Sequence, residues 1–239
     1  MRSMRPGVQV GLSSVLLLAS TFFATGQSAV PQADPVDKPP AEISFHFERP
    51  GLPVPQFSIK LRENGAARYE AEQAERPSTA TAMRGEAAQH IDRTLMLSQV
   101  TATKIFKTAR ELKDFNIECA TKLKNIADTG KKTLTYAGPD GNGSCSYNYS
   151  ENKNVAMLTD TFLGIAFTLD EGRRLEFLHR YDRLGLDAEM ISLSEEVDAG
   201  RALELGTISQ TLTALAGDMA VLERVRQRAM KLLDQANIQ

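Results

Sequence analysis

The stretch FSIKLRENGAARYEAE, residues 57–72, decides the fold class, because it predicts two antiparallel strands joined by a tight turn. Apolar and polar side chains alternate in its first half, as in a strand with one buried face. Asn64-Gly65 is a dipeptide typical of a two-residue hairpin loop. The return strand, near Ala66 to Ala71, has a weaker pattern. Strands joined in this way indicate an antiparallel sheet.

Two further segments on either side of this hairpin predict strands. ISFHFE, residues 43–48, alternates strictly. HIDRTLMLS, residues 90–98, resumes alternation through Ile91, Thr94 and Met96, and its register is left open. Between the hairpin and residues 90–98, residues 72–89 are small and polar, so we expect a long mobile loop of the kind often found at functional sites.

A helix and a second hairpin follow. Ser98 is expected to cap a helix whose apolar face is formed by Ala102, Ile105, Phe106, Ala109 and Leu112. Residues 131–149 then predict a hairpin with its turn at residues 139–143. Cys145 shares the parity of Tyr147 and Tyr149 and should point to the same side.

The chain begins with the anatomy of a secretory signal peptide. Arg2 and Arg5 precede an apolar stretch from Val8 to Ala24, and cleavage is expected after Gly26 or after Ala29. An uncleaved anchor is the alternative. Residues 1–29 are therefore assigned to the signal peptide, and the proline-rich residues 30–42 to a disordered tether. A secreted or periplasmic location follows from this assignment.

The expected export bears on the state of the two cysteines of the chain. Oxidising compartments allow disulfides to persist, and an even count favours pairing of Cys119 with Cys145. Such a loop is expected to add about 3 kcal/mol of stability. Two unpaired thiols are the alternative.

From residue 151 onward the pattern is helical only. An apolar period runs through residues 155–184, and Thr168 with Glu171 resembles a capping box, so this stretch predicts one helix kinked near Gly172 or two in succession. Further helices are expected over Ala188–Val197, from Thr207 to Gly217, and after a cap at Asp218. The predicted fold class is α+β, with an antiparallel sheet of about five strands and one packed helix in residues 43–150. Residues 151–239 form an all-helical C-terminal lobe of the same unit.

No motif for a metal, cofactor or nucleophile stands out. The three histidines, His46, His90 and His179, are far apart in the sequence, and no metal site or cofactor is predicted. Asp140, Asn142 and Ser144 alternate as in a calcium loop, but a hairpin turn explains them better. Asn142 and Asn148 each begin a glycosylation tripeptide, and their modification is left open.

Two charged segments allow a functional and a structural interpretation. In residues 170–189, Glu171, Arg173, Arg174, Glu176, His179 and Asp182 would line a groove for acid–base chemistry, or they form ion pairs on a helix that buries Leu175, Leu178, Tyr181 and Leu184. The structural interpretation is favoured. Between Lys104 and Lys132, eight basic residues outnumber four acidic ones, which suits an anionic polymer or membrane headgroups, although a solvated helix face is the ordinary explanation.

The segments FSIKLRENGAARYEAE, TATKIFKTARELKDFN and ADTGKKTLTY together resemble uncharacterised secreted bacterial proteins of the domain-of-unknown-function kind. The resemblance spans roughly residues 56 to 183. It implies a bacterial envelope or exported location and transfers no catalytic or binding residue.

These observations predict an exported, non-enzymatic binding or structural domain that engages an unknown envelope protein or polymer. After removal of residues 1–29 the net charge is −4, which gives no reason to expect nucleic acid, and no transmembrane anchor is expected after cleavage. The alternative is a secreted hydrolase with a carboxylate and histidine site around Glu171–Asp182.

Overall fold

The computed structural model describes residues 40–75 and 87–236. The chain divides into residues 1–37 and residues 38–239, and the second unit is the one described below. The predicted signal peptide and most of the predicted tether lie outside the described residues, as does the central part of the predicted loop, residues 76–86. Glu42, assigned to the tether from the sequence, is the first residue of a strand.

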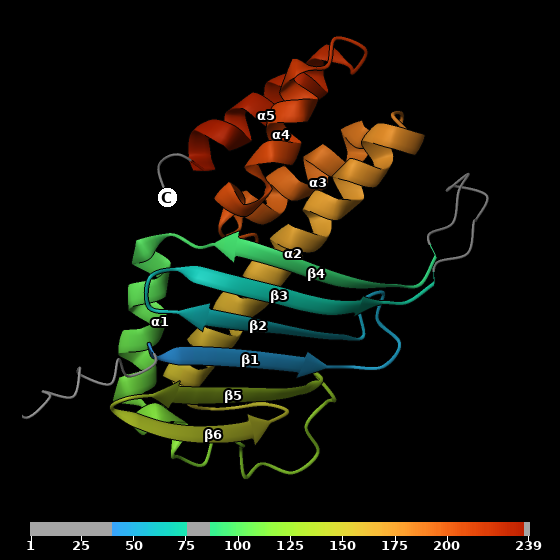
Figure 1. Cartoon of the computed structure of the whole chain (residues 1–239). Coiled ribbons are helices and arrows are strands. Elements are labelled where there is room, and N and C mark those ends of the chain that lie inside the picture. The colour runs from blue at the N-terminus through green and yellow to red at the C-terminus, as the bar shows by residue number, and fades with distance from the viewer. Residues whose placement is uncertain (1–39, 76–86, 237–239) are drawn as a thin grey trace, which may run out of the picture. The chain divides into compact units, whose positions relative to one another are not determined.

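The sheet has six strands, one more than predicted, and all neighbouring strands are antiparallel. The strands are β1 (Glu42–Glu48), β2 (Gln56–Arg62), β3 (Ala66–Gln73), β4 (Gln89–Met96), β5 (Lys131–Gly138) and β6 (Gly141–Tyr147). Their order across the sheet is β4-β3-β2-β1-β5-β6 (Figure 1). The weakly patterned return strand β3 is held by β2 on one side and β4 on the other, so pairing compensates for its small alanine side chains.

Both hairpin turns differ in length from the sequence prediction. In the first, Glu63, Asn64 and Gly65 form a three-residue loop, because Gly65 takes a left-handed conformation with φ of +84°. Glycine adopts this conformation without steric cost, as the three-residue hairpin requires. In the second, only Pro139 and Asp140 lie outside the strands, since Gly138 already pairs with Gly141.

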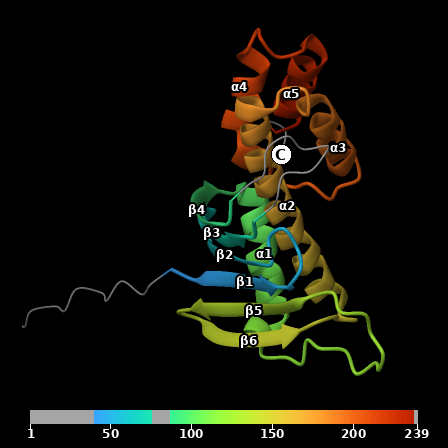
Figure 2. The same ribbon diagram turned by 90° about the vertical axis from the view of Figure 1, so that its right-hand side faces the viewer.

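One face of the sheet is buried by two helices, α1 (Gln99–Glu111) and α2 (Lys153–Tyr181), which lie on the same side of it (Figures 1 and 2). Ser98 caps α1 as predicted, and its side chain accepts a hydrogen bond from the Thr101 amide. The opposite face carries charged and hydroxyl side chains that pair across strands, such as Arg68 with Asp92 at 2.6 Å.

The helix α2 is continuous, so the stretch forms one helix rather than two, and the predicted capping box does not form. Thr168 lies inside the helix and donates its hydroxyl to the Gly164 carbonyl. A hydroxyl that bonds back along the helix in this way does not require the helix to end. Asn152 caps α2 instead, accepting from the amides of Asn154 and Val155.

The remaining helices are α3 (Leu186–Asp198), a 3₁₀ turn at Leu205–Ile208, α4 (Ser209–Gly217) and α5 (Glu223–Ala236). They form a second apolar cluster with the C-terminal half of α2, while its N-terminal half belongs to the cluster under the sheet. Asp218, predicted to cap the last helix, lies five residues before α5 and accepts from the Ala220 amide instead. The arginines at 224, 226 and 228 lie in the first half of α5, so they do not complement the dipole of its C-terminus.

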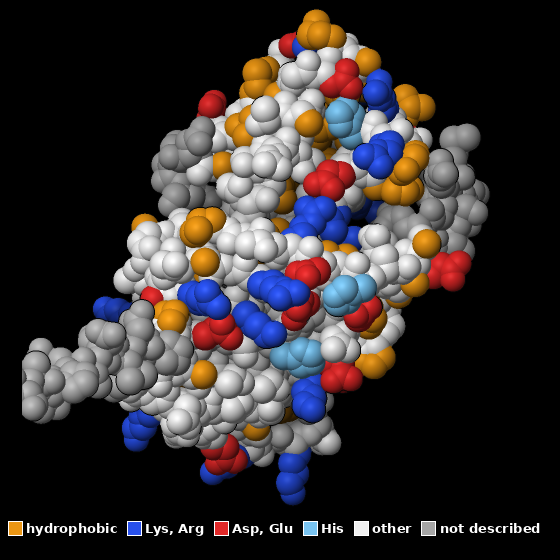
Figure 3. Space-filling model, viewed as in Figure 1, with side chains coloured by type: hydrophobic (Ala, Val, Ile, Leu, Met, Phe, Trp, Pro, Cys, Tyr) orange, Lys and Arg blue, Asp and Glu red, His pale blue; other side chains and the backbone are white. Residues whose placement is uncertain are grey.

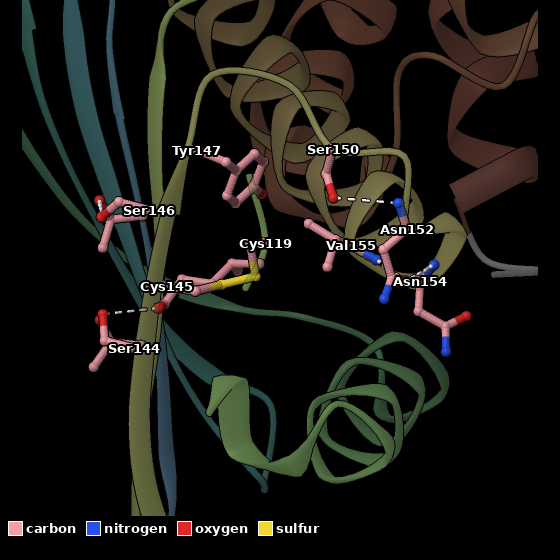
Figure 4. Close-up of a disulfide and its surroundings, with 12 residues drawn as sticks. Cys119, Ser144, Cys145, Ser146, Tyr147, Ser150, Asn152, Asn154 and Val155 are labelled. Carbon is pink, nitrogen blue, oxygen red and sulfur yellow. Dashed lines mark hydrogen bonds between the residues drawn. A yellow bond between two sulfur atoms is a disulfide. The ribbon is translucent and has the colours of Figure 1, made fainter. Parts of the chain in front are cut away.

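The predicted disulfide is confirmed. Cys119 and Cys145 are bonded, with their Cα atoms 5.8 Å apart. Figure 4 shows Cys145 and Tyr147 on the side of β6 that faces the helices, and Ser144 and Ser146 on the other side. The bond therefore ties the segment after α1 to an edge strand from within the core. Tyr149, predicted to share this face, lies beyond β6 and is exposed.

Within the described residues, no helix is both long enough and apolar enough to cross a bilayer.

Candidate functional site

The buried face of the sheet becomes polar at the end of β3, near residue 73, and at the adjacent start of β4, near residue 89. The sequence named Ile91, Thr94 and Met96 in the alternation of this strand and left its register open; in the structure the inward residues of β4 are Ile91, Arg93 and Leu95. Side chains alternate with a period of two, so this register also turns Arg93 toward α2. On the neighbouring strand Gln73 occupies an inward position and is only 4% exposed.

The facing side of α2 supplies partners for these buried polar groups. Arg93 forms two hydrogen bonds to Glu176, the shorter of 2.9 Å. Arg173 bonds Gln73 and lies 3.1 Å from Asp170, which also accepts from the Tyr69 hydroxyl at 3.0 Å. Burial would raise the pKa of Glu176, but hydrogen bonds from Arg93 and Thr211 hold it below its usual value. Glu176 therefore stays ionised and anchors the Arg93 guanidinium.

A second group of charges lies where α2 ends. His179 Nε2 and Asp218 Oδ2 are 2.8 Å apart, and Arg183 approaches the same carboxylate at 3.4 Å. The hydrogen bond from His179, together with that from the Ala220 amide, lowers the pKa of Asp218. Asp218 thus joins the loop before α5 to the end of α2.

Most of the polar side chains described above line one pocket with a volume of 920 Å³, called here the arginine pocket. Its lining residues are Gln73, Ala87, Gln89, Arg93, Arg173, Glu176, Phe177, His179, Arg180, Tyr181, Arg183 and Asp218. Figure 3 shows basic side chains gathered around a hollow between the strands and the helices above them. Four arginines face two carboxylates in this lining, so the pocket is locally positive on a chain whose formal net charge is −2.

Arg180 differs from the other arginines of the pocket. No carboxylate among the described residues pairs with it, and its guanidinium lies 5.9 Å from the centroid of the Tyr181 ring. It is exposed at the mouth of the pocket. A guanidinium in this position keeps its donors for a ligand.

The structure divides the charged cluster of residues 170–189 between two sides of α2. Arg173, Glu176 and His179 line the pocket, whereas Glu171 and Arg174 face α3, where Arg174 pairs with Glu189. Asp182 follows α2 as its C-terminal flanking residue. The single groove proposed from the sequence therefore does not form.

The structural interpretation of the same segment was wrong in one respect. Leu175 and Leu178 are buried as predicted, but Tyr181 is 47% exposed and Leu184 is 85% exposed. Tyr181 is the last residue of α2, and Leu184 lies in the short loop before α3 begins at Leu186.

The other candidate residues do not form a second chemical site. His46 and His90 share the open face of the sheet, where His90 bonds Glu72 at 2.7 Å. Asp140 lies in the hairpin turn and pairs with Arg110. In the part of the chain that the structure describes, no group of three or more His, Cys, Asp or Glu is placed to hold a metal ion.

The basic segment from Lys104 to Lys132 is not one continuous surface. Arg110 pairs with Glu63 and Asp140, and Lys122 with Glu118. Lys132 is buried, and its ammonium donates to oxygens of Thr129, Gly130 and Asn148. These contacts engage Arg110, Lys122 and Lys132 within the fold, whereas Lys104 and Lys107 are exposed on α1, as expected of a solvated helix face.

The two candidate glycosylation residues lie in different settings. Asn142 is exposed on β6, whereas the Asn148 amide donates to the Ala127 carbonyl and its oxygen accepts from the Thr129 amide. Asn148 thus contributes to the loop that leads into β5.

Comparison with protein families adds no constraint, since no family model matches the chain and no curated protein matches its sequence. The resemblance to secreted bacterial proteins stays a prediction. Strict alternation counted from Ile91 places Arg93 on the inward face of its strand. The sequence pattern could therefore have predicted the contribution of Arg93 to the pocket. No local signal indicated Asp218 as the partner of His179.

Proposed function

We propose that this protein is an exported binding domain that holds an anionic group in the arginine pocket. The observation that carries the proposal is the convergence of Arg93, Arg173, Arg180 and Arg183 on one pocket. Guanidinium groups bind carboxylates and phosphates through paired hydrogen bonds. The signal peptide predicted from the sequence and the disulfide support an oxidising compartment outside the cytosol.

The way the arginines are held supports binding rather than simple solvation. Arg93 and Arg173 are fixed by Glu176, Asp170 and Gln73, so little side-chain entropy remains to be lost when a ligand is bound. Arg180 and Arg183 lie nearer the mouth and are more exposed. The pocket thus combines fixed donors at its base with adjustable donors at its rim.

The test is a thermal-shift and calorimetric titration with pyrophosphate and with citrate, at low and at high salt. We expect both anions to raise the melting temperature, with an effect that weakens as salt screens the charges. Arg180→Ala should weaken binding by about tenfold, because it removes one charge-assisted donor set. The control is Lys104→Ala with Lys107→Ala, which removes two exposed charges of α1.

Binding that is equally weakened by the control, or absent in the wild-type protein, would contradict the proposal. The first result would indicate a diffuse effect of net charge, and the second would leave the pocket without an anionic ligand.

A hydrolase remains the second candidate, because His179 and Asp218 form a dyad on the wall of the pocket. A histidine oriented by a carboxylate can act as a general base. The described residues that line the pocket include no serine, threonine or cysteine, so this base would have to activate water.

Turnover of p-nitrophenyl phosphate and p-nitrophenyl acetate separates the two candidates. Binding without turnover is expected of the domain proposed here. Turnover that is lost in His179→Gln and kept in His90→Gln, a histidine of the open sheet face, would establish the hydrolase instead.

A further inference from the structure

Two loops beside the arginine pocket are held together by one carboxylate. The loop that follows α2 contains Arg183 and Leu184, and the loop between α4 and α5 contains Asp218 and Met219. Asp218 contacts both His179 and Arg183, so the two loops meet at the rim of the pocket. We call residues 181–184 together with residues 219–222 the tip.

The tip exposes an unusual amount of apolar surface. Leu184 and Met219, 85% and 79% exposed, are the two most exposed large apolar side chains in the described part of the chain. Tyr181 and Leu222 add exposures of 47% and 44%. Singly exposed apolar residues are ordinary, but a group of them on adjoining loops marks an interaction surface.

The charges next to this apolar group indicate what it contacts. Arg180 and Arg183 are exposed at the same end of α2, and the pocket that they line also includes Tyr181 of the tip. Apolar side chains that enter a bilayer interface, flanked by basic ones that attract anionic headgroups, are typical of peripheral membrane binding. Figure 3 shows apolar side chains beside the basic ones on this part of the molecule.

We propose that the tip docks on a membrane surface rich in anionic phospholipid, with a lipid phosphate bound in the arginine pocket. This inference rests on the proposed anion binding and specifies its ligand. Leu184 and Met219 enter the interface, and Arg180 and Arg183 contact the headgroups. A volume of 920 Å³ is within the range of pockets that enclose small molecules, and accommodates a headgroup.

The experiment is vesicle flotation with phosphatidylglycerol mixed into phosphatidylcholine, compared with phosphatidylcholine alone. We expect binding only to the anionic vesicles. Leu184→Ser combined with Met219→Ser should weaken this binding by about tenfold, from the loss of buried apolar surface. Pyrophosphate binding should be unchanged in the same variant, because neither side chain lines the pocket.

A matched control removes the two next most exposed apolar side chains, at the end of β4 and the start of α1. Met96→Ser with Val100→Ser, at 65% and 72% exposure, should bind vesicles like the wild-type protein. Arg180→Ala should weaken both vesicle and pyrophosphate binding, which links the two sites.

Three results would overturn the inference, and they differ in what they say about the pocket. Pyrophosphate binding without vesicle binding would leave the proposed function intact and remove the membrane. Absence of both would remove both proposals. Self-association that Leu184→Ser with Met219→Ser abolishes, without any vesicle binding, would assign the tip to contacts between copies of this chain.

Discussion

Glu171 on α2 shows how burial changes the ionisation of a single residue. Burial raises the pKa of Glu171 from 4.5 to about 8, and the hydrogen bond and charge of Glu189 add to this shift. The charge of Arg174 opposes the shift, and that of Asp170 adds a smaller increase. One of its carboxyl oxygens, Oε2, is buried without a hydrogen-bond partner. Glu171 therefore keeps its proton in the folded protein at pH values where the unfolded chain has lost it.

This difference predicts that stability falls as pH rises. Between pH 4.5 and about 8 the folded state binds a proton at Glu171 that the unfolded state has lost. The contribution of this proton to the free energy of unfolding therefore decreases through this window and is lost above it. Glu171→Gln should be more stable than the wild-type protein at pH 9 by about 1–2 kcal/mol, a value reduced for partial exposure of the carboxyl group, and nearly equal to it at pH 4. Urea unfolding followed by circular dichroism at both pH values measures this.

The control is Glu195→Gln, which changes an exposed glutamate of the neighbouring helix α3. Parallel pH profiles for Glu171→Gln and the wild-type protein would show that Glu171 titrates normally.

At the scale of elements, the disulfide holds β6, which is an edge strand of the sheet formed by the described residues. Cys119 and Cys145 close a loop with a sequence separation of 26. Replacing both with serine should lower the free energy of unfolding by about 3 kcal/mol, chiefly by enlarging the unfolded ensemble. Thermal unfolding of the variant, beside the wild-type protein with and without reductant, tests this. A variant as stable as the oxidised protein would contradict it.

The packing of α2 on the 3₁₀ turn Leu205–Ile208 depends on Gly172. A Cβ atom at this position would come within 2.4 Å of Ile208 Cγ2, and Ile208 is 2% exposed and cannot move aside. Alanine would gain about 1 kcal/mol in helix propensity but cost about 1–3 kcal/mol in overpacking. We expect Gly172→Ala to be destabilising.

Gly217, at the end of α4, is the matched control for Gly172. No atom lies within 4 Å of the point that a Cβ atom would occupy there, so Gly217→Ala should be neutral or slightly stabilising. Chemical denaturation of both variants compares them directly. Equal effects of the two substitutions would show that contact with Ile208 does not matter.

At the scale of the whole described unit, α2 and Glu204 connect the two apolar clusters. Glu204 is 8% exposed and accepts from the Ser98 amide and hydroxyl, each at 2.7 Å, and from the Thr101 hydroxyl. A buried carboxylate at the N-terminus of α1 is also favoured by the helix dipole. These contacts join the sheet to the C-terminal helices.

This connection predicts one unfolding transition rather than two. Near-ultraviolet circular dichroism reports mainly the sheet, where Tyr69, Tyr136 and Tyr147 are buried, and the signal at 222 nm reports mainly the helices. The two midpoints should coincide. Separate midpoints in the wild-type protein would show that the two clusters unfold independently.

Glu204→Gln should lower the free energy of unfolding by about 1–3 kcal/mol, because charge-assisted hydrogen bonds are weakened.

Much of the fold was predictable because its signals are local. Alternation in residues 43–48 and 57–61, the cap at Ser98 and the apolar faces of the helices each depend on neighbours within a few positions. The boundaries that were wrong have two causes. Thr168 bonds back to Gly164 inside a continuous helix, whereas Asp218 is engaged by the distant His179, a tertiary contact.

The candidate site was predictable only in part. The sequence singled out Glu176 and His179, but its functional alternative placed them in one groove with Glu171, and Arg93 and Asp218 were not recognised as their partners. A pocket built from a strand, a helix and a distant loop leaves no periodic signal, because its residues are neighbours only after folding.

The sequence by itself determined the kinds of elements, their antiparallel pairing and the pairing of the two cysteines, because periodicity, turn chemistry and an even cysteine count act over short range or through simple counting. Only the tertiary structure decided which side of α2 meets the sheet and which meets α3. That choice depends on how distant apolar surfaces are buried together, and it placed Arg173 in the pocket, Glu171 in a partly buried position facing α3, and Leu184 at the exposed tip.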